Sequence, residues 1–243
     1  MNLNNFVVDR ILRAVGKSNE TDEVLFAINQ VTNASLNVTS ETAEAVDALG
    51  TPIVIFNRAK TAEFSAENAL FDLGLMATQA GSKKVSGAAI VPAFDVIDGG
   101  KLKHEPKDAD AVKFYAVNGD GSLGAEITRA GVTISGTSVT GLEDVEGQVM
   151  AVYEYEAADA VAVINSATEF PKACELVLEV LGCDVCNQED LIYAYLIFPN
   201  FKISPDFDWN VQTDGTHPFS GTAMQNYCDT KKELYKLIIV GDD

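Results

Sequence analysis

Hydrophobic and polar residues alternate with a period of two along much of this chain. Residues 35–39 and 148–155 follow the alternation, and residues 173–181 nearly do. Val, Ile, Tyr and Thr are prominent in these segments, and such residues suit a pleated surface that is buried on one side. The pattern therefore predicts β-strands that each place one face on a core.

Turn-forming residues separate the predicted strands. Glycine, asparagine or proline interrupts the pattern at residues 98–100, 118–121 and 199–200, and again at Gly136 and Gly141. Many short strands joined by turns predict a mainly β fold. We expect a single domain over residues 1–243, with a candidate β-rich acidic insertion at about residues 130–165.

One segment has the period of a helix instead. Between Ser65 and Ala80, apolar residues recur at spacings of three and four. Ser65 could cap the start, and Gly81 could end the helix in a left-handed conformation. We expect one α-helix that flanks the β-structure. The helix is expected to pack on the β-structure through Leu70, Phe71, Leu73 and Met76.

The stretch from residue 38 to residue 52 contains few large apolar side chains. It lies between two segments that read as strands, residues 36–38 and 53–56. Because long loops without a core of their own are usually functional or disordered, we interpret this stretch as a long functional loop.

The formal net charge of −19 limits the choice of binding partners. With 36 acidic and 17 basic residues, the chain can hardly form the cationic surface that non-specific nucleic-acid binding needs. Residues 130–230 carry 16 of the acidic residues and only two basic ones, Lys172 and Lys202. The excess is either a solubility surface or a surface that must not adhere to a polyanion.

Neither a membrane span nor a secretion signal is expected. The longest clear apolar run, residues 191–198, is far shorter than a bilayer span, and the first residues do not open a signal peptide. We therefore expect a cytosolic protein with no membrane partner.

Four cysteines leave three hypotheses open. Cys183 and Cys186 form a C-x-x-C motif, and together with Cys174 and Cys228 they could supply a tetrahedral zinc site or redox chemistry. Buried free thiols are the favoured interpretation, because Cys174 and Cys228 have no neighbouring cysteine and Cys174 lies in an alternating strand. Neither histidine, His104 or His217, has a catalytic sequence context. We expect no cofactor, no catalytic residues and no enzymatic activity.

Several segments together resemble the major tail tube proteins of long-tailed bacteriophages. They are NFVVDRILR at residues 5–13, TAEFSAENALFDLGL at 61–75, and YLIFPNFK at 195–202, followed by HPF at 217–219. These segments cover about a third of the chain and extend over most of its length. Residues 130–165 match nothing in that family.

The resemblance implies a fold, an assembly and a location. Tail tube proteins have a β-barrel or sandwich with a flanking helix, form hexameric rings, and stack these rings into the tube through which DNA leaves the capsid. The expected partners are other copies of the chain, the tape measure, baseplate or tail tip, and terminator proteins, and DNA in transit without specific binding. The expected location is the virion tail, and the host cytoplasm during assembly.

Two structural roles agree with these implications. The polar stretch would suit the loop that stacks one ring on the next, with Ser40, Glu41, Glu44, Asp47 and Gly50 as candidate contact residues. An acidic tube lumen would let DNA pass without adhering. The alternatives are another virion component, such as a capsid decoration or tail terminator protein, or a small enzyme or zinc-binding module.

Overall fold

The computed structural model describes residues 5–97, 100–225 and 232–241, and 59% of these residues are in β-strands. Contacts divide it into two units, one made of the residues up to Lys84 and from Val163 onward, and one of Val85–Ala162. Sequence analysis placed its candidate insertion at about residues 130–165, and the compact second unit begins much earlier, at Val85. The expected mainly β fold with one α-helix is confirmed.

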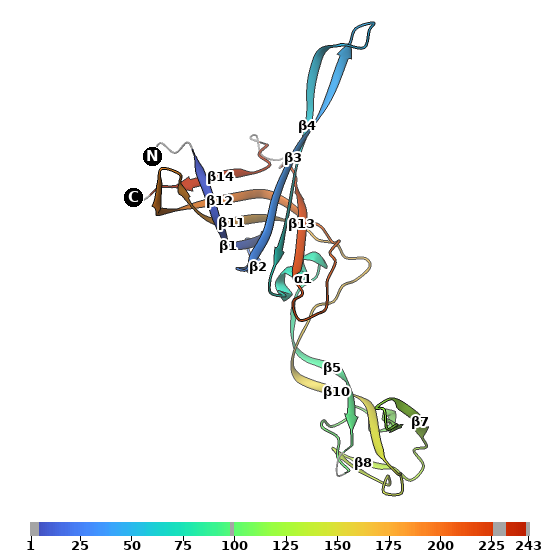
Figure 1. Ribbon diagram of the computed structural model, residues 1–243. Coiled ribbons are helices and arrows are strands. Elements are labelled where there is room, and N and C mark those ends of the chain that lie inside the picture. Colours follow the sequence, from blue (N-terminus) through green and yellow to red (C-terminus); the bar gives the residue numbers. More distant parts are fainter. Residues whose placement is uncertain (1–4, 98–99, 226–231, 242–243) are drawn as a thin grey trace. The chain divides into compact units, whose positions relative to one another are not determined.

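The first unit is built on one antiparallel sheet with the strand order β2-β1-β11-β12-β13-β4-β3, in which β14 also pairs with β12 (Figure 1). Within the described residues, no closed barrel is formed. Its elements are β1 (Phe6–Ser18), β2 (Val24–Ile28), β3 (Val31–Val46), β4 (Pro52–Asn68), α1 (Leu73–Gln79), β11 (Ala173–Asp184), β12 (Asn187–Ile203), β13 (His217–Ala223) and β14 (Lys236–Val240).

Strand β12 joins the two parts of this sheet. One of its edges pairs with β11, while the other pairs first with β14 and then, from Phe201, with β13. The turn predicted at Pro199-Asn200 is wrong, because both residues lie inside β12. The register with β11 shifts there, and proline, which has no N–H to donate, is tolerated at such an irregularity.

The core of the first unit lies between strands β1, β11, β12 and strands β3, β4, β13, which run in different directions in Figure 1. Four phenylalanines occupy its centre. The ring of Phe64 lies 5.6 Å from Phe198, 6.5 Å from Phe201 and 6.0 Å from Phe219 between ring centroids. All four are at most 2% exposed, so they bury the largest apolar area at the point where β4, β12 and β13 meet.

The helix is shorter than sequence analysis predicts. It spans Leu73–Gln79 and not residues 65–80, because Ser65 and Glu67 belong to β4 and pair with β3 and β13. Asp72, and not Ser65, is the N-cap, and its carboxylate accepts the Leu75 N–H at 2.7 Å. The predicted stop at Gly81 is confirmed, since its φ is +69°.

The helix also buries a different face from the predicted one. Leu70 is 60% exposed and Phe71 and Leu73 are each 37% exposed, whereas Met76 is half-buried. The buried helical residues are Leu75, Ala77, Thr78 and Gln79. The difference arises because Leu70 and Phe71 precede the helix, so the prediction combined residues from a turn with residues from the helix.

The second unit is a four-stranded antiparallel sheet with a small hairpin, and it has its own core. The strand order is β5-β10-β6-β7, and β8 pairs with β9. Its elements are β5 (Val85–Val96), a 3-10 turn (Ala109–Ala111), β6 (Lys113–Val117), β7 (Leu123–Ile127), β8 (Thr133–Ser135), β9 (Ser138–Thr140) and β10 (Gln148–Ala162). Val85 pairs with Ala162, so the chain enters and leaves this unit through two adjacent strands, β5 and β10.

A buried polar network stabilises this second core. The Tyr153 hydroxyl donates to the Asp95 carboxylate at 2.5 Å, and the Lys103 N–H donates to the same carboxylate at 2.9 Å. Burial raises the pKa of Tyr153 to about 12, and its hydrogen bond to Asp95 acts in the same direction. Burial opposes ionisation of Asp95, but these hydrogen bonds and the Lys103 charge lower its pKa overall.

Candidate self-assembly surface

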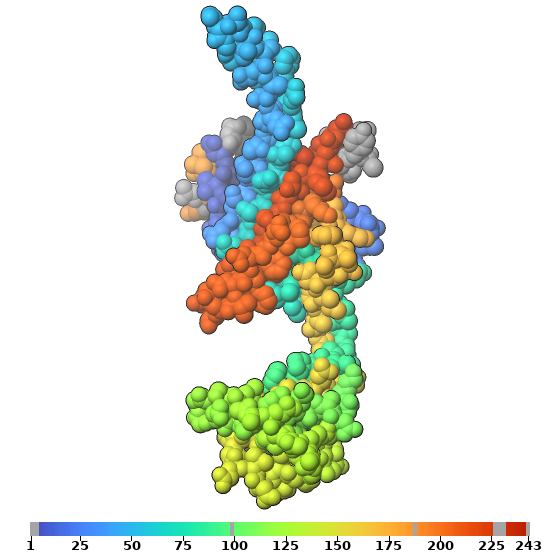
Figure 2. All heavy atoms as spheres, turned by 90° about the vertical axis from the view of Figure 1, so that its right-hand side faces the viewer, coloured from blue at the N-terminus to red at the C-terminus, as the bar shows by residue number. Residues whose placement is uncertain are grey.

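The ends of β3 and β4 form a long two-stranded hairpin that leaves the core, and we call residues 40–60 the arm (Figures 1 and 2). Every residue from Glu44 to Thr61 is exposed. Side chains of the arm therefore cover almost nothing in this chain, although the backbone pairing continues as far as Val46 and Pro52.

The loop predicted for residues 38–52 is therefore wrong, since only a short turn separates the strands. The Asp47 carboxylate accepts the N–H groups of Leu49 and Thr51, both at 2.9 Å, and Gly50 has a φ of +85°. Among the candidate stacking residues, Ser40, Glu41 and Glu44 lie on β3, and Asp47 and Gly50 lie in the turn. The turn chemistry of Asp47 and Gly50 fixes the arm's tip.

One face of the arm is apolar. Ala43 lies opposite Phe56 and Ala45 lies opposite Val54, so these four residues share a face. Phe56 is 57% exposed and Val54 44% exposed. An isolated two-stranded hairpin is at best marginally stable in water, and its apolar face gains stability only when something covers it.

A second uncovered apolar surface lies on the sheet of the first unit. Strand pairing aligns Leu181 with Tyr193 and Val240, and Glu179 with Tyr195 and Ile238. The neighbouring row aligns Val177 with Ile197 and Lys236. We call these nine residues, with the β1 residues that flank them, the outer face, because the alternate residues Leu178, Val180 and Ala194 face the core.

The outer face is uncovered on its β14 side and at Tyr193, whereas Leu181 is buried and Tyr195 and Ile197 are half-buried. Tyr193 is 48% exposed, Ile238 43% and Val240 46%. Three cations flank them on β1 (Arg10, Arg13 and Lys17), and Arg13 and Lys17 pair with Glu179 at 3.6 Å and with Glu175 at 3.5 Å. Apolar side chains with a charged rim are typical of a protein interaction surface.

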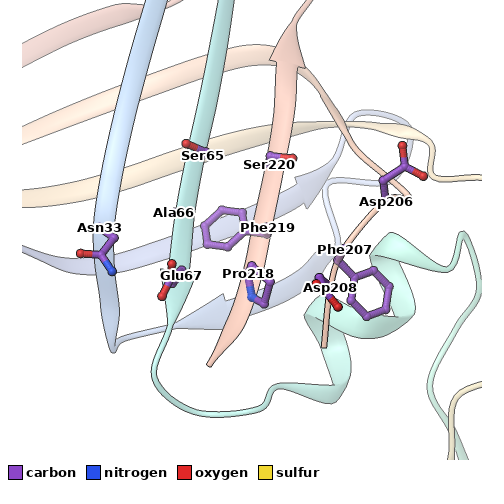
Figure 3. A pocket seen from close by; sticks show the side chains of 10 residues that line it. All are labelled: Asn33, Ser65, Ala66, Glu67, Asp206, Phe207, Asp208, Pro218, Phe219 and Ser220. Carbon is purple, nitrogen blue, oxygen red and sulfur yellow. The ribbon is translucent and has the colours of Figure 1, made fainter. Parts of the chain in front are cut away.

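A shallow hollow of about 270 Å³ lies beside strands β4 and β13 (Figure 3). Glu67, Asp206 and Asp208 contribute carboxylates to it, and Phe207 and Pro218 contribute apolar walls. Within the described ranges, no three His, Cys, Asp or Glu side chains are arranged to hold a metal ion. The described lining of the hollow therefore offers no metal ligand set.

His217 lies at the base of the loop that lines this hollow, and it is fully buried. Its Nε2 lies 2.8 Å from the Gln79 Oε1, and its Nδ1 accepts the Asp72 N–H at 3.4 Å. The Phe71 ring stacks on His217 at 4.7 Å and on Trp209 at 4.4 Å between centroids. Because Nδ1 accepts a hydrogen bond, the imidazole of His217 is neutral. The stacked rings of His217, Phe71 and Trp209 hold the loop that contains Trp209.

Burial lowers the pKa of His217 below its ordinary value of 6.5, although the Asp72 charge partly opposes the shift. Below about pH 6.5 the unfolded chain binds a proton at this residue that the folded chain does not bind. The free energy of unfolding should therefore fall as the pH decreases from 7 to 5, by at most about 1.4 kcal/mol per pH unit.

This pH dependence can be measured by the fluorescence of Trp209, the single tryptophan of the chain, in urea titrations at each pH. His217→Gln should flatten the dependence between pH 7 and pH 5. His104→Gln is the matched control and should retain it. A wild-type curve that is level over this range would contradict the prediction.

The described cysteines do not come together. Cys174 is fully buried, and burial raises the pKa of its thiol to about 11. Cys183 is half-buried at the other end of β11, about 30 Å away along the strand, and Cys186 is exposed in the turn after it. Cys228 lies outside the described residues. The distance excludes a zinc site that contains both Cys174 and Cys183.

Sequence reasoning missed the outer face, although a signal was present. Residues 191–198 form a near-continuous apolar run and do not alternate. A continuous run is typical of a strand that is covered on both faces, and only one face of β12 is covered in this chain.

Comparison with known proteins gives a family match over almost the whole chain. The model of the family described as YomU/Tube protein family matches residues 6–236, which include nearly all of both units. No match was found among curated proteins. The match confirms the resemblance to phage tail tube proteins, which are structural and non-enzymatic proteins of the virion tail. The chain therefore belongs to the YomU/Tube protein family of phage tail tube proteins.

Proposed function

We propose that this chain assembles into hexameric rings, and that the rings stack into a tail tube through which DNA is ejected. The observation that supports self-assembly is the arm, whose apolar face and strand edges are uncovered in a single chain. Exposed apolar surface of this kind is stabilised by burial against a partner, and unpaired strand edges favour β-augmentation.

The net charge of −19 supports a conduit that DNA does not adhere to. A wall with six to ten phosphate contacts would hold DNA with strong, salt-dependent affinity, whereas an acidic wall avoids such contacts. Screening limits the repulsion to about 8 Å at physiological ionic strength, so the acidic wall acts at short range. We therefore propose a net acidic lumen.

In this function the chain meets further tail proteins at the ends of the tube. These are the tape measure, the baseplate or tail tip, and the terminator protein, and assembly takes place in the host cytoplasm. Family membership supports partners of the tail in general.

Negative-stain microscopy and analytical ultracentrifugation of the purified chain test the proposal. We expect six-fold rings or hollow tubes whose amount increases with protein concentration. Tubes should not retain double-stranded DNA in co-sedimentation at low salt. A chain that stays monomeric at high concentration would contradict self-assembly, and DNA retention that salt abolishes would contradict the acidic lumen.

A further inference from the structure

We propose that the arm of one copy docks on the outer face of a second copy. This inference rests on the proposed self-assembly and names the two surfaces that meet. The occupant of the outer face is a second copy of this chain, and its apolar and acidic arm is the part that binds.

The arm and the outer face both present apolar side chains to solvent. The arm presents Phe56 and Val54 beside Ala43 and Ala45, and the outer face presents Tyr193, Tyr195, Ile197, Ile238 and Val240. Both surfaces belong to regular strands, so side chains stand in rows that can interdigitate. Aromatic side chains near the centre of such a contact supply most of the binding energy.

The tip of the arm and the outer face also carry opposite charges. The carboxylates of the arm (Glu41, Glu44 and Asp47) extend to its tip, whereas its two cations, Arg58 and Lys60, lie at its base. The outer face is flanked by Arg10, Arg13 and Lys17 on β1, and Lys236 on β14. This is a concentration of cations in a chain with only 17 basic residues.

These cations are available to a neighbour. Within the described residues, Lys236 makes no ion pair. The pairs of Arg10 with Asp9, of Arg13 with Glu179 and of Lys17 with Glu175 are all partly exposed, so each contributes little to the chain's own stability. A carboxylate that approaches them gains attraction without breaking a buried pair.

Charge also sets the direction of docking. The turn between β11 and β12 is acidic, with Asp184 at the end of β11 and Glu189 at the start of β12. Lys236 lies toward the opposite end of the outer face, opposite Ile197. The acidic tip of the arm is therefore expected to point toward Lys236, away from Asp184 and Glu189.

The geometry has a consequence for symmetry. The arm and the outer face are different surfaces of one chain, so their contact is heterologous. Heterologous contacts close into rings or continue into filaments, and they do not stop at a dimer. A single contact type of this kind is sufficient for a growing assembly.

Two double variants test the contact, and each disrupts only one of the two surfaces. Val54→Thr with Phe56→Thr removes the apolar face of the arm, and Tyr193→Thr with Ile238→Thr removes the centre of the outer face. Threonine keeps the strand propensity, so both variants should fold, which circular dichroism checks. Each variant alone should stay monomeric, with association weakened by about 30-fold or more.

An equimolar mixture of the two variants gives the decisive result. The intact arm of the second variant can dock on the intact outer face of the first, and no free pair of surfaces then remains. We expect a heterodimer of one to one stoichiometry by analytical ultracentrifugation, and no tubes. A mixture that remains entirely monomeric, or that forms tubes, would overturn the inference.

Charge reversal gives an independent measurement. Lys236→Glu should weaken association about 10-fold, because it places a carboxylate opposite the acidic tip of the arm. Lys84→Glu, an exposed lysine outside both surfaces, is the control and should assemble like the wild type. If the wild type assembles and Lys236→Glu assembles equally well, the docking site is wrong. If the wild type itself does not assemble, the proposed function is wrong.

Discussion

A chain in which Asn-Gly replaces residues 41–59 is expected to fold and to form neither rings nor tubes. The replacement leaves Ser40 paired with Lys60, and an Asn-Gly turn can connect paired strands directly. All removed residues are exposed except Ala43, which is half-buried, so the core of the first unit loses almost no buried area. The shortened chain therefore loses only the surface that we propose for assembly.

Analytical ultracentrifugation and a thermal melt measure the two parts of this prediction. The sedimentation coefficient should be that of a monomer at every concentration, and the melting temperature should stay within a few degrees of the wild type. The control is Leu49→Ser, which changes the arm's tip but neither apolar pair, and it should still assemble. Tubes formed by the shortened chain would show that the arm is dispensable.

The second large effect is expected from Phe198→Ala. Phe198 is fully buried and its ring lies 5.6 Å from Phe64 and 5.5 Å from Phe201 between centroids. Truncation leaves a cavity at the crossing of β4, β12 and β13, and changes of this type cost about 3–5 kcal/mol. The melting temperature should fall by roughly 10 °C.

Calorimetry of the monomeric protein measures this loss, and Phe56→Ala provides the matched control. Phe56 is 57% exposed on the arm, so the same chemical change there should alter the stability of the monomer by less than about 0.5 kcal/mol. Equal losses in both variants would mean that the four-phenylalanine cluster is not the stabilising centre of the first unit.

The strands that cover a core could be predicted from the sequence. Alternation located residues 35–39, 148–155 and 173–181, which lie in β3, β10 and β11, and it also indicated that Cys174 is buried. Alternation is visible in residues 148–155 and 173–181 because one face meets the core and the other meets water, whereas in residues 35–39 only Leu36 packs on the core. A period of two in the sequence therefore indicates a strand with one buried face and one exposed face.

The arm could not be predicted in this way, because both of its faces are exposed. On the β4 side of the arm, the apolar residues 53–56 read as a strand. On the β3 side, Thr42 and Glu44 lie on one face and alanines on the other, without a large apolar residue from Glu41 to Ala45, so this stretch reads as a loop. Only the β-propensity of its Thr and Val residues favoured a strand.

The outer face and the unit boundary depend on pairing between distant segments. β1 pairs with β11, and the rows of the outer face are set by register shifts that no local pattern shows. The boundary lies where β5 begins at Val85 and β10 ends at Ala162, and it is set by the pairing of these two distant residues. The helix start was misplaced for a local reason, since the alternation of β4 continues through Asn68.

The pairing of Val85 with Ala162 makes the second unit a cassette. Its entry and exit points are neighbours on one two-stranded ladder, and its core is built only from residues of the unit itself. A short turn that joins residue 84 to residue 163 would remove the cassette without cutting a strand of the first unit. Another domain with adjacent chain ends could be inserted in its place, so this ladder is a ready position for displaying foreign proteins.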